Sequence, residues 1–432
     1  MSQFKTVRGM RDFLPKDAKK LRYVEKIARE LAHLYGYEEV ITPVVEHYDL
    51  LAAKSGEEIR ERMYAFKDMG GRKVALRPEF TASIARLIAT KMRNTPKPMK
   101  LFCTGSLYRY DEPQYGRFRE FWQANYELIG SSEPEADMEI LTLTNDLIGR
   151  LGLHNYWFKI GHMGILRGIL NQEGIAEGQQ HLIMQLLDKK KQDEALTLAK
   201  ESNASQNCIT VLKKILDTKG KDASQILKMA KHIVTDYDNA VAAVENLQEI
   251  LELTRDSNVK FETLVEAGFA RGLEYYTGMI FELYVPEIEI ALGGGGRYDK
   301  LIELFGGEPT PAVGVAQGID RLVLAMNEQK VPLKIPEESK VMIIPVDEEL
   351  RTKAVELSLE LRKASISTEV ELMKRTVSKA LSDADRRGVT HVVIVGPEEL
   401  REGKVVLRDM KKRKQRVVEI KGLPKEILKD MD

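Results

Sequence analysis

Residues Leu101–Gly130 read LFCTGSLYRYDEPQYGRFREFWQANYELIG. The pattern predicts two strands joined by a charged loop from Asp111 to Arg117 that contains proline and glycine. Because side chains two positions apart share one face of a strand, Arg119, Gln123 and Glu127 are expected on one face. A polar face of this kind is most often the solvent side of a sheet, so a solvated face and a binding site are both open at this point.

Arginines elsewhere in the chain favour the binding site. Arginine's planar guanidinium matches phosphate and carboxylate oxygens in pairs and stays charged. For one such arginine alone, an ion pair at the surface or between domains is the simpler explanation. Several together, in a chain without a phosphate-binding loop, indicate a polyphosphate held mainly by side chains. The arginines at turns, among glycines or beside the loop are Arg109, Arg117, Arg119, Arg271, Arg297 and Arg321.

Composition limits the class of protein. The 432 residues are enough for two or three domains. Lysine plus arginine and aspartate plus glutamate both number 66, so any nucleic-acid surface must be local. The N-terminal segment lacks the apolar stretch of a signal peptide, and no run has the length of a membrane span. Cys103 and Cys208 are expected to be reduced, buried thiols. We expect a soluble, cytoplasmic enzyme or assembly factor without a membrane partner.

The order of predicted elements divides the chain into five segments. Residues 1–170 and 259–330 mix strands and helices and are predicted to form two parts of one core. Residues 171–258 lack proline and show helical periodicity, which predicts a helical domain inserted into that core. Residues 331–338, VPLKIPEE, are predicted to form a linker. In residues 339–432 strands and helices alternate, which predicts a small, separate α/β domain of mixed parallel type.

Motifs of several common sites are missing. The chain has no G-x-x-x-x-G-K-[ST] loop, H-E-x-x-H pair, C-x-x-C pair or nucleophile elbow, which disfavours hydrolysis by a triad or a protein-bound zinc. The run Gly293–Gly296 does not fit the dinucleotide fingerprint. It is either a flexible turn or a strand that lets a ligand approach the backbone. Tyr275 and Tyr276 are adjacent, and neighbours in a strand face opposite ways, so we expect at most one to line a pocket.

Six segments carry a family resemblance. YEEVITPVVE (37–46), with Pro43, resembles the dimer-forming motif 1 of class II aminoacyl-tRNA synthetases. LYRYDEPQYGRFREFWQ (107–123) resembles motif 2, and AVGVAQGIDRLVL (312–324) resembles motif 3. ARGLEYYTG (270–278) and LGGGGRYDKL (292–301) resemble two motifs specific to the histidine enzymes, and RPEFTASIAR (77–86) resembles their amino-acid site. Over nearly its whole length the chain is therefore similar to histidine–tRNA ligases.

The resemblance implies a fold and a reaction. The fold is an α+β catalytic core, with the antiparallel sheet and flanking helices of class II synthetases, plus a helical insertion and a C-terminal α/β anticodon-binding domain. The reaction joins L-histidine to its cognate tRNA through a histidyl-adenylate. ATP is a substrate accompanied by Mg²⁺, without a metal site of the protein's own. The motif 1 resemblance implies a homodimer.

The resemblance also assigns roles to residues by their place in these motifs. Arg109 bridges the histidine carboxylate and the α-phosphate, Arg271 faces the α-phosphate from the other side, and Arg321 binds the γ-phosphate. Asp111 stands where motif 2 usually carries glutamate, which leaves the adenine contacts open. The residues implied to bind histidine are Glu79, Phe80, Thr81, Gln123, Glu127, Tyr275 and Tyr276. The residues implied to bind ATP are Arg109, Asp111, Arg117, Arg271 and Arg321.

Two other functions compete with ligation. A regulatory paralogue of the first phosphoribosyltransferase of histidine biosynthesis shares the fold and binds histidine, but it typically lacks the C-terminal domain and the motif arginines. A non-enzymatic tRNA-binding relative tolerates loss of Glu79, Gln123 or Glu127. The chain keeps these three residues, the motif arginines and residues 339–432. The basic segment RDMKKRKQR (408–416) does not decide between the functions, because a solvated hairpin explains it more simply than an RNA contact.

Overall fold

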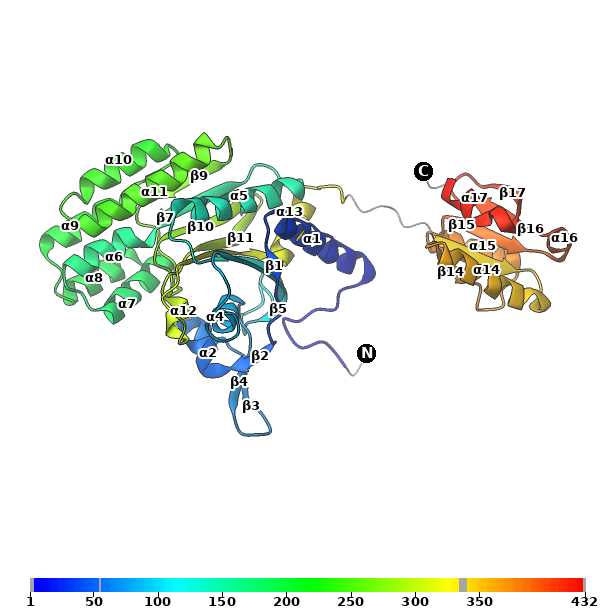
Figure 1. Ribbon diagram of the computed structural model, residues 1–432, viewed down its shortest axis with the longest axis horizontal. Coiled ribbons are helices and arrows are strands. Elements are labelled where there is room, and N and C mark those ends of the chain that lie inside the picture. Colours follow the sequence, from blue (N-terminus) through cyan, green and yellow to red (C-terminus); the bar gives the residue numbers. More distant parts are fainter. Residues whose placement is uncertain (1–3, 54–55, 334–339, 430–432) are drawn as a thin grey trace. The chain divides into compact units, whose positions relative to one another are not determined.

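The computed structural model describes residues 4–53, 56–333 and 340–429. Contacts divide the chain into two compact units, Met1–Leu333 and Lys334–Asp432 (Figure 1). Most of the expected linker, residues 334–338, lies outside the described residues. Among the described helices, none combines the length and the apolar character needed to cross a membrane.

The first unit is built on a nine-stranded sheet (Figure 1). Its pairs β1–β5 and β7–β9 are parallel and the other six are antiparallel, which confirms the expected antiparallel core. In sheet order the strands are β1 (Glu38–Glu39), β5 (Met99–Tyr108), β6 (Glu120–Ile129), β12 (Ala312–Gly318), β11 (Ile288–Arg297), β10 (Met279–Val285), β7 (Trp157–His162), β9 (Glu262–Glu266) and β8 (Lys219–Gly220).

A three-stranded sheet lies beside the large one, with β4 (Lys73–Leu76) between β2 (Val45–His47) and β3 (Ala65–Lys67). Pro43 stands between β1 and β2, outside both strands, where its missing backbone N–H costs no ladder hydrogen bond. The short helices α2 (Tyr48–Ala52) and α3 (Gly56–Glu61) connect these strands. The β3–β4 hairpin projects from the unit (Figure 1).

Helices flank the large sheet. Helix α1 (Pro15–Leu34) buries Leu21, Val24, Ala28 and Leu31, whose spacing places them on one face. It begins at proline, whose fixed φ suits the first turn. Helix α1 contacts α5 (Pro134–Arg150) and α13 (Ile319–Glu328), whereas α4 (Thr81–Thr90) contacts α12 (Leu301–Leu304).

Helices from the predicted insertion gather at one end of the sheet (green in Figure 1). They share one continuous hydrophobic core with the sheet, and β8 extends the sheet itself. The limits 171–258 therefore stay a prediction, because contacts assign this segment to the first unit. Cys208 in this lobe and Cys103 in β5 are buried free thiols, as expected. The helices of this lobe are α6 (Met163–Gln172), which begins before the predicted limit at 171, and then α7 (Glu177–Asp188), α8 (Gln192–Glu201), α9 (Gln206–Asp217), α10 (Ala223–Ile233) and α11 (Asp238–Asp256).

The second unit is a five-stranded sheet covered by helices. β13 (Lys340–Pro345) pairs in parallel with β14 (Ser367–Val370) and β15 (His391–Val395). β16 (Lys404–Asp409) and β17 (Lys414–Glu419) continue the sheet as an antiparallel hairpin, so the expected hairpin at RDMKKRKQR is confirmed. The helical segments are η1 (Glu348–Leu350), α14 (Arg351–Lys363), α15 (Val377–Arg386), α16 (Pro397–Arg401), η2 (Ile420–Gly422) and α17 (Leu423–Lys429). This mixed α/β arrangement matches the expectation.

Candidate active site

A cavity of about 500 Å³ opens on the central strands of the large sheet. Its floor comes from β6, β11 and β12, which are neighbours in the sheet. The start of α4, the loop between β5 and β6, the segment 271–276 and the start of α13 form its walls. Segments distant in sequence thus meet at one site.

Glycines leave the room that this cavity needs. A Cβ atom on Gly314 of β12 would lie 1.7 Å from the carboxylate of Glu127 on the neighbouring strand. A Cβ atom on Gly294 of β11 would lie 2.5 Å from the Arg271 guanidinium. Both distances are far below van der Waals contact, so side chains from neighbouring segments extend across the bare backbone. The glycine run is a strand rather than a turn, which decides between the two alternatives.

Glu127 lies at one end of the cavity and is only 1% exposed. The Tyr298 hydroxyl donates to it at 2.5 Å, the Thr81 hydroxyl at 2.9 Å and the Asn125 amide at 3.4 Å. Burial raises the pKa of this carboxyl to about 7, although the hydrogen bonds favour its ionised form. The carboxyl is therefore poised to change its charge near neutral pH.

Glu79 is a second buried carboxylate in the same wall. It accepts hydrogen bonds from the backbone amides of Thr81 at 2.5 Å and Ala82 at 2.7 Å, at the N-terminus of α4. Burial raises its pKa, against the effect of these bonds. The side-chain oxygens of Gln123 and Asn125 are also buried here, and neither has a hydrogen-bond donor among the described residues. This end of the cavity therefore offers acceptors to a ligand that donates.

Arginines occupy the other end. Arg109 donates to the Pro78 carbonyl at 2.9 Å, Arg321 to the Ala291 carbonyl at 2.6 Å, and Arg271 to the Phe281 carbonyl at 3.4 Å. These backbone acceptors orient the guanidinium groups without cancelling their charge. Among the described residues, no carboxylate lies within 4 Å of Arg109, Arg117 or Arg321, whereas Glu282 is 3.7 Å from Arg271.

The pKa of Arg321 is lower than that of an ordinary arginine, in part because other positive charges lie close to it. Burial, followed by the charges of nearby Arg109, Arg117 and Arg271, lowers it to about 10. Unneutralised cations facing one cavity are stabilised when an anion lies between them. The arginine end is therefore suited to a polyanion.

Two of the six arginines singled out in the sequence do not line this cavity. Arg297 is buried and forms an ion pair with Asp137, at 3.0 Å from its Nε. Arg119 stacks over the Tyr110 ring at 3.7 Å and donates to the Asp111 carbonyl at 3.0 Å. Arg297 therefore forms an ion pair, as the simpler explanation expected, but the pair is buried within the first unit rather than at the surface or between domains.

The prediction for the adjacent tyrosines is wrong. Tyr275 and Tyr276 both line the cavity. They lie in a non-strand segment between β9 and β10, so the alternation of a strand does not apply to them. Their ring centroids are 4.9 Å apart, and both rings are available as walls.

Phe80 and Asp111 complete the predicted set. Phe80 is fully buried in the hydrophobic core and does not line the cavity, unlike its neighbours Glu79 and Thr81. Asp111 lies in the cavity wall, with its carboxylate 3.2 Å from Arg62.

The sequence assigned no role to Tyr298 or Asn125, which both donate to Glu127. The period of a strand does place Asn125 on the face of Gln123 and Glu127, and Tyr298 belongs to the segment LGGGGRYDKL. The described residues hold no group of three His, Cys, Asp or Glu side chains placed to bind a metal ion.

Comparisons with known proteins give consistent matches over most of the chain. A family model described as histidyl-tRNA synthetase matches residues 9–322, and one described as anticodon binding domain matches residues 340–430. A histidine–tRNA ligase of Methanocaldococcus jannaschii is 42% identical over 422 residues, which cover 97% of this chain and 98% of the relative.

Two solved structures share the fold. The apo histidyl-tRNA synthetase of S. aureus aligns with a TM-score of 0.70 at 26% identity, over 98% of this chain and 100% of that one. A Bacillus halodurans protein described as an ATP phosphoribosyltransferase regulatory subunit/histidyl-tRNA synthetase aligns with a TM-score of 0.75 at 26% identity, over 89% and 97% of the chains. With the family model and the full-length relative, these likenesses establish that the chain belongs to the histidyl-tRNA synthetases, which are class II aminoacyl-tRNA synthetases.

Proposed function

We propose that the two ends of the cavity divide the substrates of a histidine–tRNA ligase, with ATP at the arginines and histidine at the carboxylates. One observation carries this assignment: guanidinium groups without carboxylate partners and the buried carboxylates Glu79 and Glu127 line one cavity on the central strands. The phosphates neutralise the first group. The ammonium and imidazole N–H groups of histidine satisfy the second.

The arginines act on the first step of the reaction. An oxygen of the histidine carboxylate attacks the α-phosphorus of ATP in line, the bond to the β-phosphate oxygen breaks, and pyrophosphate leaves. Arg109 holds the attacking carboxylate and an α-phosphate oxygen together, which fixes their geometry. Arg271 faces the same phosphate from the opposite wall and stabilises charge on its equatorial oxygens. Arg321 binds the γ-phosphate and keeps the triphosphate bent.

The carboxylate end selects histidine. Glu127 accepts the imidazole N–H, with Tyr276 as the second polar partner and Tyr275 as a wall. Glu79, Thr81 and Gln123 receive the substrate ammonium, and the unpartnered oxygen of Gln123 supports this role. An apolar side chain of similar size leaves Glu127 buried without its donor, which costs far more than a lost contact.

The remaining predicted residues bind the other parts of the substrates. Asp111 accepts from the adenine amino group, and Arg117 lies where the acceptor end of tRNA enters. Its terminal ribose hydroxyl attacks the carbonyl carbon of the adenylate, and AMP leaves. Mg²⁺ arrives bound to the ATP phosphates, because the described residues provide no cage of carboxylates for it. When bound with ATP, it would neutralise part of the phosphate charge.

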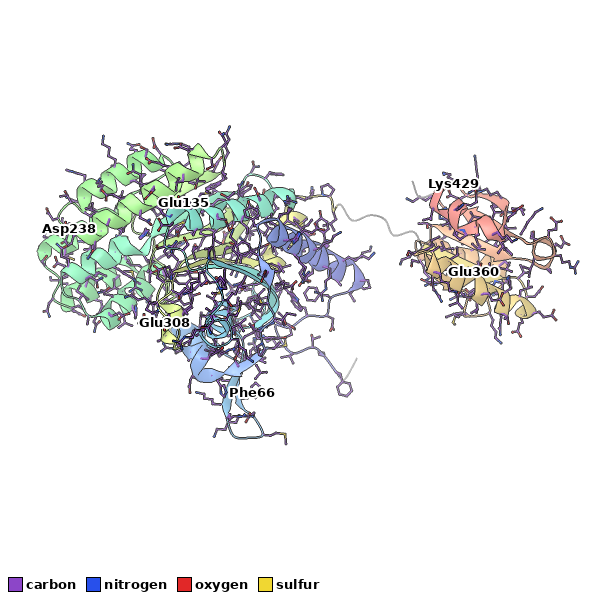
Figure 2. All side chains as sticks on the ribbon, in the orientation of Figure 1. Phe66, Glu135, Asp238, Glu308, Glu360 and Lys429 are labelled. Carbon is purple, nitrogen blue, oxygen red and sulfur yellow. The ribbon has the colours of Figure 1, made fainter. Side chains whose placement is uncertain are left out.

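The protein acts as a homodimer through the segment that resembles motif 1. Ile41 is 90% exposed, and Val44 and Val45 are exposed as well. Phe66 and Met69 add two exposed apolar side chains on the projecting hairpin, where Figure 2 marks Phe66. Exposed apolar side chains that gather on neighbouring segments are typical of an interface with another chain. Light scattering should give the mass of a dimer, and Ile41→Asp should shift it toward that of a monomer, whereas Leu372→Asp, at an exposed apolar residue of the second unit, should not.

The second unit, which matches the anticodon-binding model, holds the distal end of the tRNA. We assign the reaction to the cytoplasm, where charged tRNA is consumed by protein synthesis.

Amino-acid-dependent exchange between pyrophosphate and ATP, without tRNA, tests the function across all twenty amino acids. Exchange with histidine alone is expected. Histidine binding without exchange would instead support the regulatory paralogue, whose role needs no adenylate. Charging of tRNA then tests the second step.

A further inference from the structure

A second cavity, of about 770 Å³, lies behind the tyrosine wall of the active site. Helices α6 and α11 form one side of it, and residues 274–278 and 299–304 form the other. Tyr275 and Tyr276 line both cavities. This volume is in the range of small-molecule sites.

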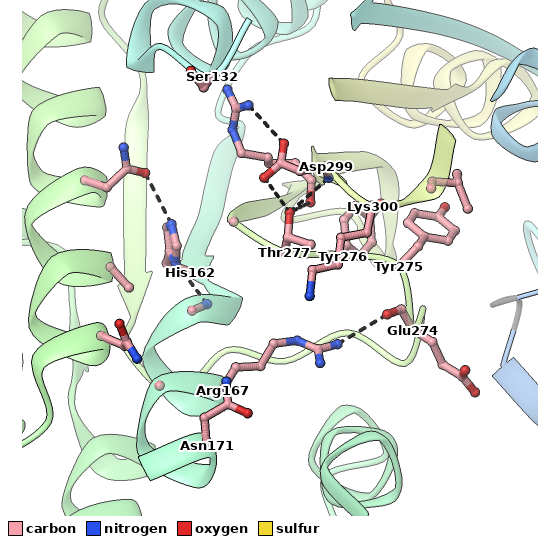
Figure 3. A pocket seen from close by; sticks show the side chains of 18 of the residues that line it. Ser132, His162, Arg167, Asn171, Glu274, Tyr275, Tyr276, Thr277, Asp299 and Lys300 are labelled. Atoms are coloured by element: carbon pink, nitrogen blue, oxygen red, sulfur yellow. Dashed lines mark hydrogen bonds and ion pairs between the residues drawn. The ribbon is translucent and has the colours of Figure 1, made fainter. Parts of the chain in front are cut away.

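Two cations extend into this cavity from opposite sides. Figure 3 shows Arg167, on α6, and Lys300, just before α12, with their charged ends pointing into the same space. In the described part of the chain, neither has a carboxylate oxygen within 4 Å. The Arg167 Nε is buried and has no hydrogen-bond partner there, while one terminal nitrogen donates to the Glu274 carbonyl at 3.2 Å. Burial lowers the pKa of Arg167, because a charged guanidinium is less stable where water is excluded.

The carboxylates around the cavity are engaged elsewhere or lie at its rim. Asp299 accepts from the Thr277 hydroxyl at 2.9 Å and from Arg297 at 3.2 Å. Glu274 is 3.6 Å from His181. The side chain of Glu177 is 65% exposed, and Glu303 is exposed. Among the described residues none of them lies within 4 Å of the two cations, although the charges of Glu177 and Glu274 offset part of the effect of burial on the pKa of Arg167.

His162, the titratable imidazole of this cavity, adds no third cation. It accepts from the Gly164 amide through Nδ1 and lies 3.2 Å from the Asn246 amide oxygen. Burial lowers its pKa to about 4, so the ring is neutral at physiological pH. The cavity thus combines two unpaired cations with neutral polar groups, among them Asn171 and Asn239.

We propose that this cavity is a second ligand site, which binds the phosphoryl group of a small molecule between Arg167 and Lys300. A phosphate monoester carries close to two negative charges at neutral pH, which matches two monovalent cations better than one carboxylate does. The volume left beside the anion accommodates an organic body, so inorganic phosphate and a sugar phosphate are the two sources to compare. Binding of either ligand here does not involve the arginines proposed to bind the triphosphate in the active site.

The ligand is coupled to the histidine pocket through residues 274–276. Arg167 holds the backbone of Glu274, and the next two residues are the tyrosine walls. An anion that binds Arg167 and moves its side chain alters this hydrogen bond to the Glu274 carbonyl. Linkage then requires that histidine and the anion change each other's affinity by the same factor. The coupling rests on the proposed histidine pocket, whereas the site itself does not.

Calorimetry of the full chain with inorganic phosphate and with ribose 5-phosphate tests the site. We expect saturable binding that is at least tenfold weaker in Lys300→Gln and in Arg167→Gln. Within the described residues the Lys300 side chain makes no hydrogen bond, and its backbone carbonyl, which accepts from the Leu304 amide, is kept in the variant, so Lys300→Gln should fold normally. The control Lys228→Gln, on an exposed residue of α10, and Arg321→Ala, in the active site, should bind like the wild type. Tighter binding of ribose 5-phosphate identifies the sugar phosphate as the source, and equal binding identifies the free anion.

Absence of binding to the wild type, or loss of binding in Arg321→Ala instead of Lys300→Gln, would reject the site. Neither result bears on histidine-dependent exchange by the wild type. Failure of the second site is therefore distinguishable from failure of the ligase function. For the coupling, the Kd of histidine should change at least threefold when the anion saturates the wild type and stay constant in Lys300→Gln. An unchanged Kd in the wild type would reject the coupling.

Discussion

The hydroxyl of Tyr298 donates a 2.5 Å hydrogen bond to Glu127, which lies 171 positions earlier in the chain. Both side chains are buried, and Gly314 on the strand beside Glu127 leaves the space that the carboxylate occupies. The carboxylate proposed to recognise histidine is thus positioned by a tyrosine from one of the histidine-specific motifs.

Removing this donor should weaken histidine recognition. A hydrogen bond to a charged group contributes about 1.5–3 kcal/mol, so Tyr298→Phe should raise the KM for histidine by about 10- to 100-fold. The KM for ATP should stay within about threefold, because Tyr298 lies at the carboxylate end. Exchange kinetics over pH 6–8 measure both constants. Equal effects on the two constants would show that Tyr298 supports the whole cavity rather than Glu127.

Glu127 should make the free enzyme less stable as pH rises. Its pKa is about 7 in the fold against 4.5 for a solvent-exposed glutamate, so the folded state binds more protons between these values. Stability is then lost as pH rises through this window, by about 3 kcal/mol. Glu127→Gln should remove the share of Glu127 and leave that of Glu79 and Asp137, whose pKa values burial also raises, and it should raise the KM for histidine. Urea denaturation at pH 5 and 8 measures it, with Glu201→Gln, on an exposed residue, as control. Equal slopes in wild type and Glu127→Gln would contradict the argument.

Arg271 should act on the transition state rather than on histidine binding. Arg271→Ala should lower histidine-dependent exchange by about 10³-fold, the scale of losing one preorganised charge at a phosphoryl centre. The Kd of histidine, from calorimetry, should change less than about threefold, since the carboxylate end is intact. Arg150→Ala, on an exposed residue at the end of α5, serves as the control. Normal exchange by Arg271→Ala would remove the residue from the catalytic set.

Arg297 should behave as a structural residue. Arg297→Met leaves the carboxylate of Asp137 buried without its partner, which typically costs about 3–5 kcal/mol. The double variant Arg297→Met with Asp137→Leu should recover part of this loss, because no buried charge remains. Urea denaturation of both variants provides the test. A single variant as stable as the wild type would show that the pair contributes nothing to the fold.

The first unit alone should carry out the first step of the reaction, whereas the second step should need both units. Residues 1–333 hold the complete cavity and their own hydrophobic core. This fragment should keep histidine-dependent exchange within about tenfold of the full chain, and it should lose most tRNA charging. Loss of exchange in a fragment with the circular dichroism of a folded protein would show that the second unit contributes to the first step.

Local patterns determined much of the site. The alternation in Leu101–Gly130 placed Gln123 and Glu127 on one face, because a strand has a period of two whatever surrounds it. The glycine run marked a close approach to the backbone, since only glycine leaves the floor of the cavity bare. The motifs, read together, identified the family.

Only the tertiary structure decided which partners each side chain has. Arg297 and Arg271 both stand near glycines in the sequence, yet Arg297 meets Asp137, 160 positions away, and Arg271 meets the open cavity. Tyr275 and Tyr276 both face the cavity because their segment is not a strand. Tyr298 reaches Glu127 because β11 and β6 both pair with β12. Sequence spacing sets the direction of a side chain along its own element, whereas its charge partners depend on contacts between distant segments, which local periodicity does not encode.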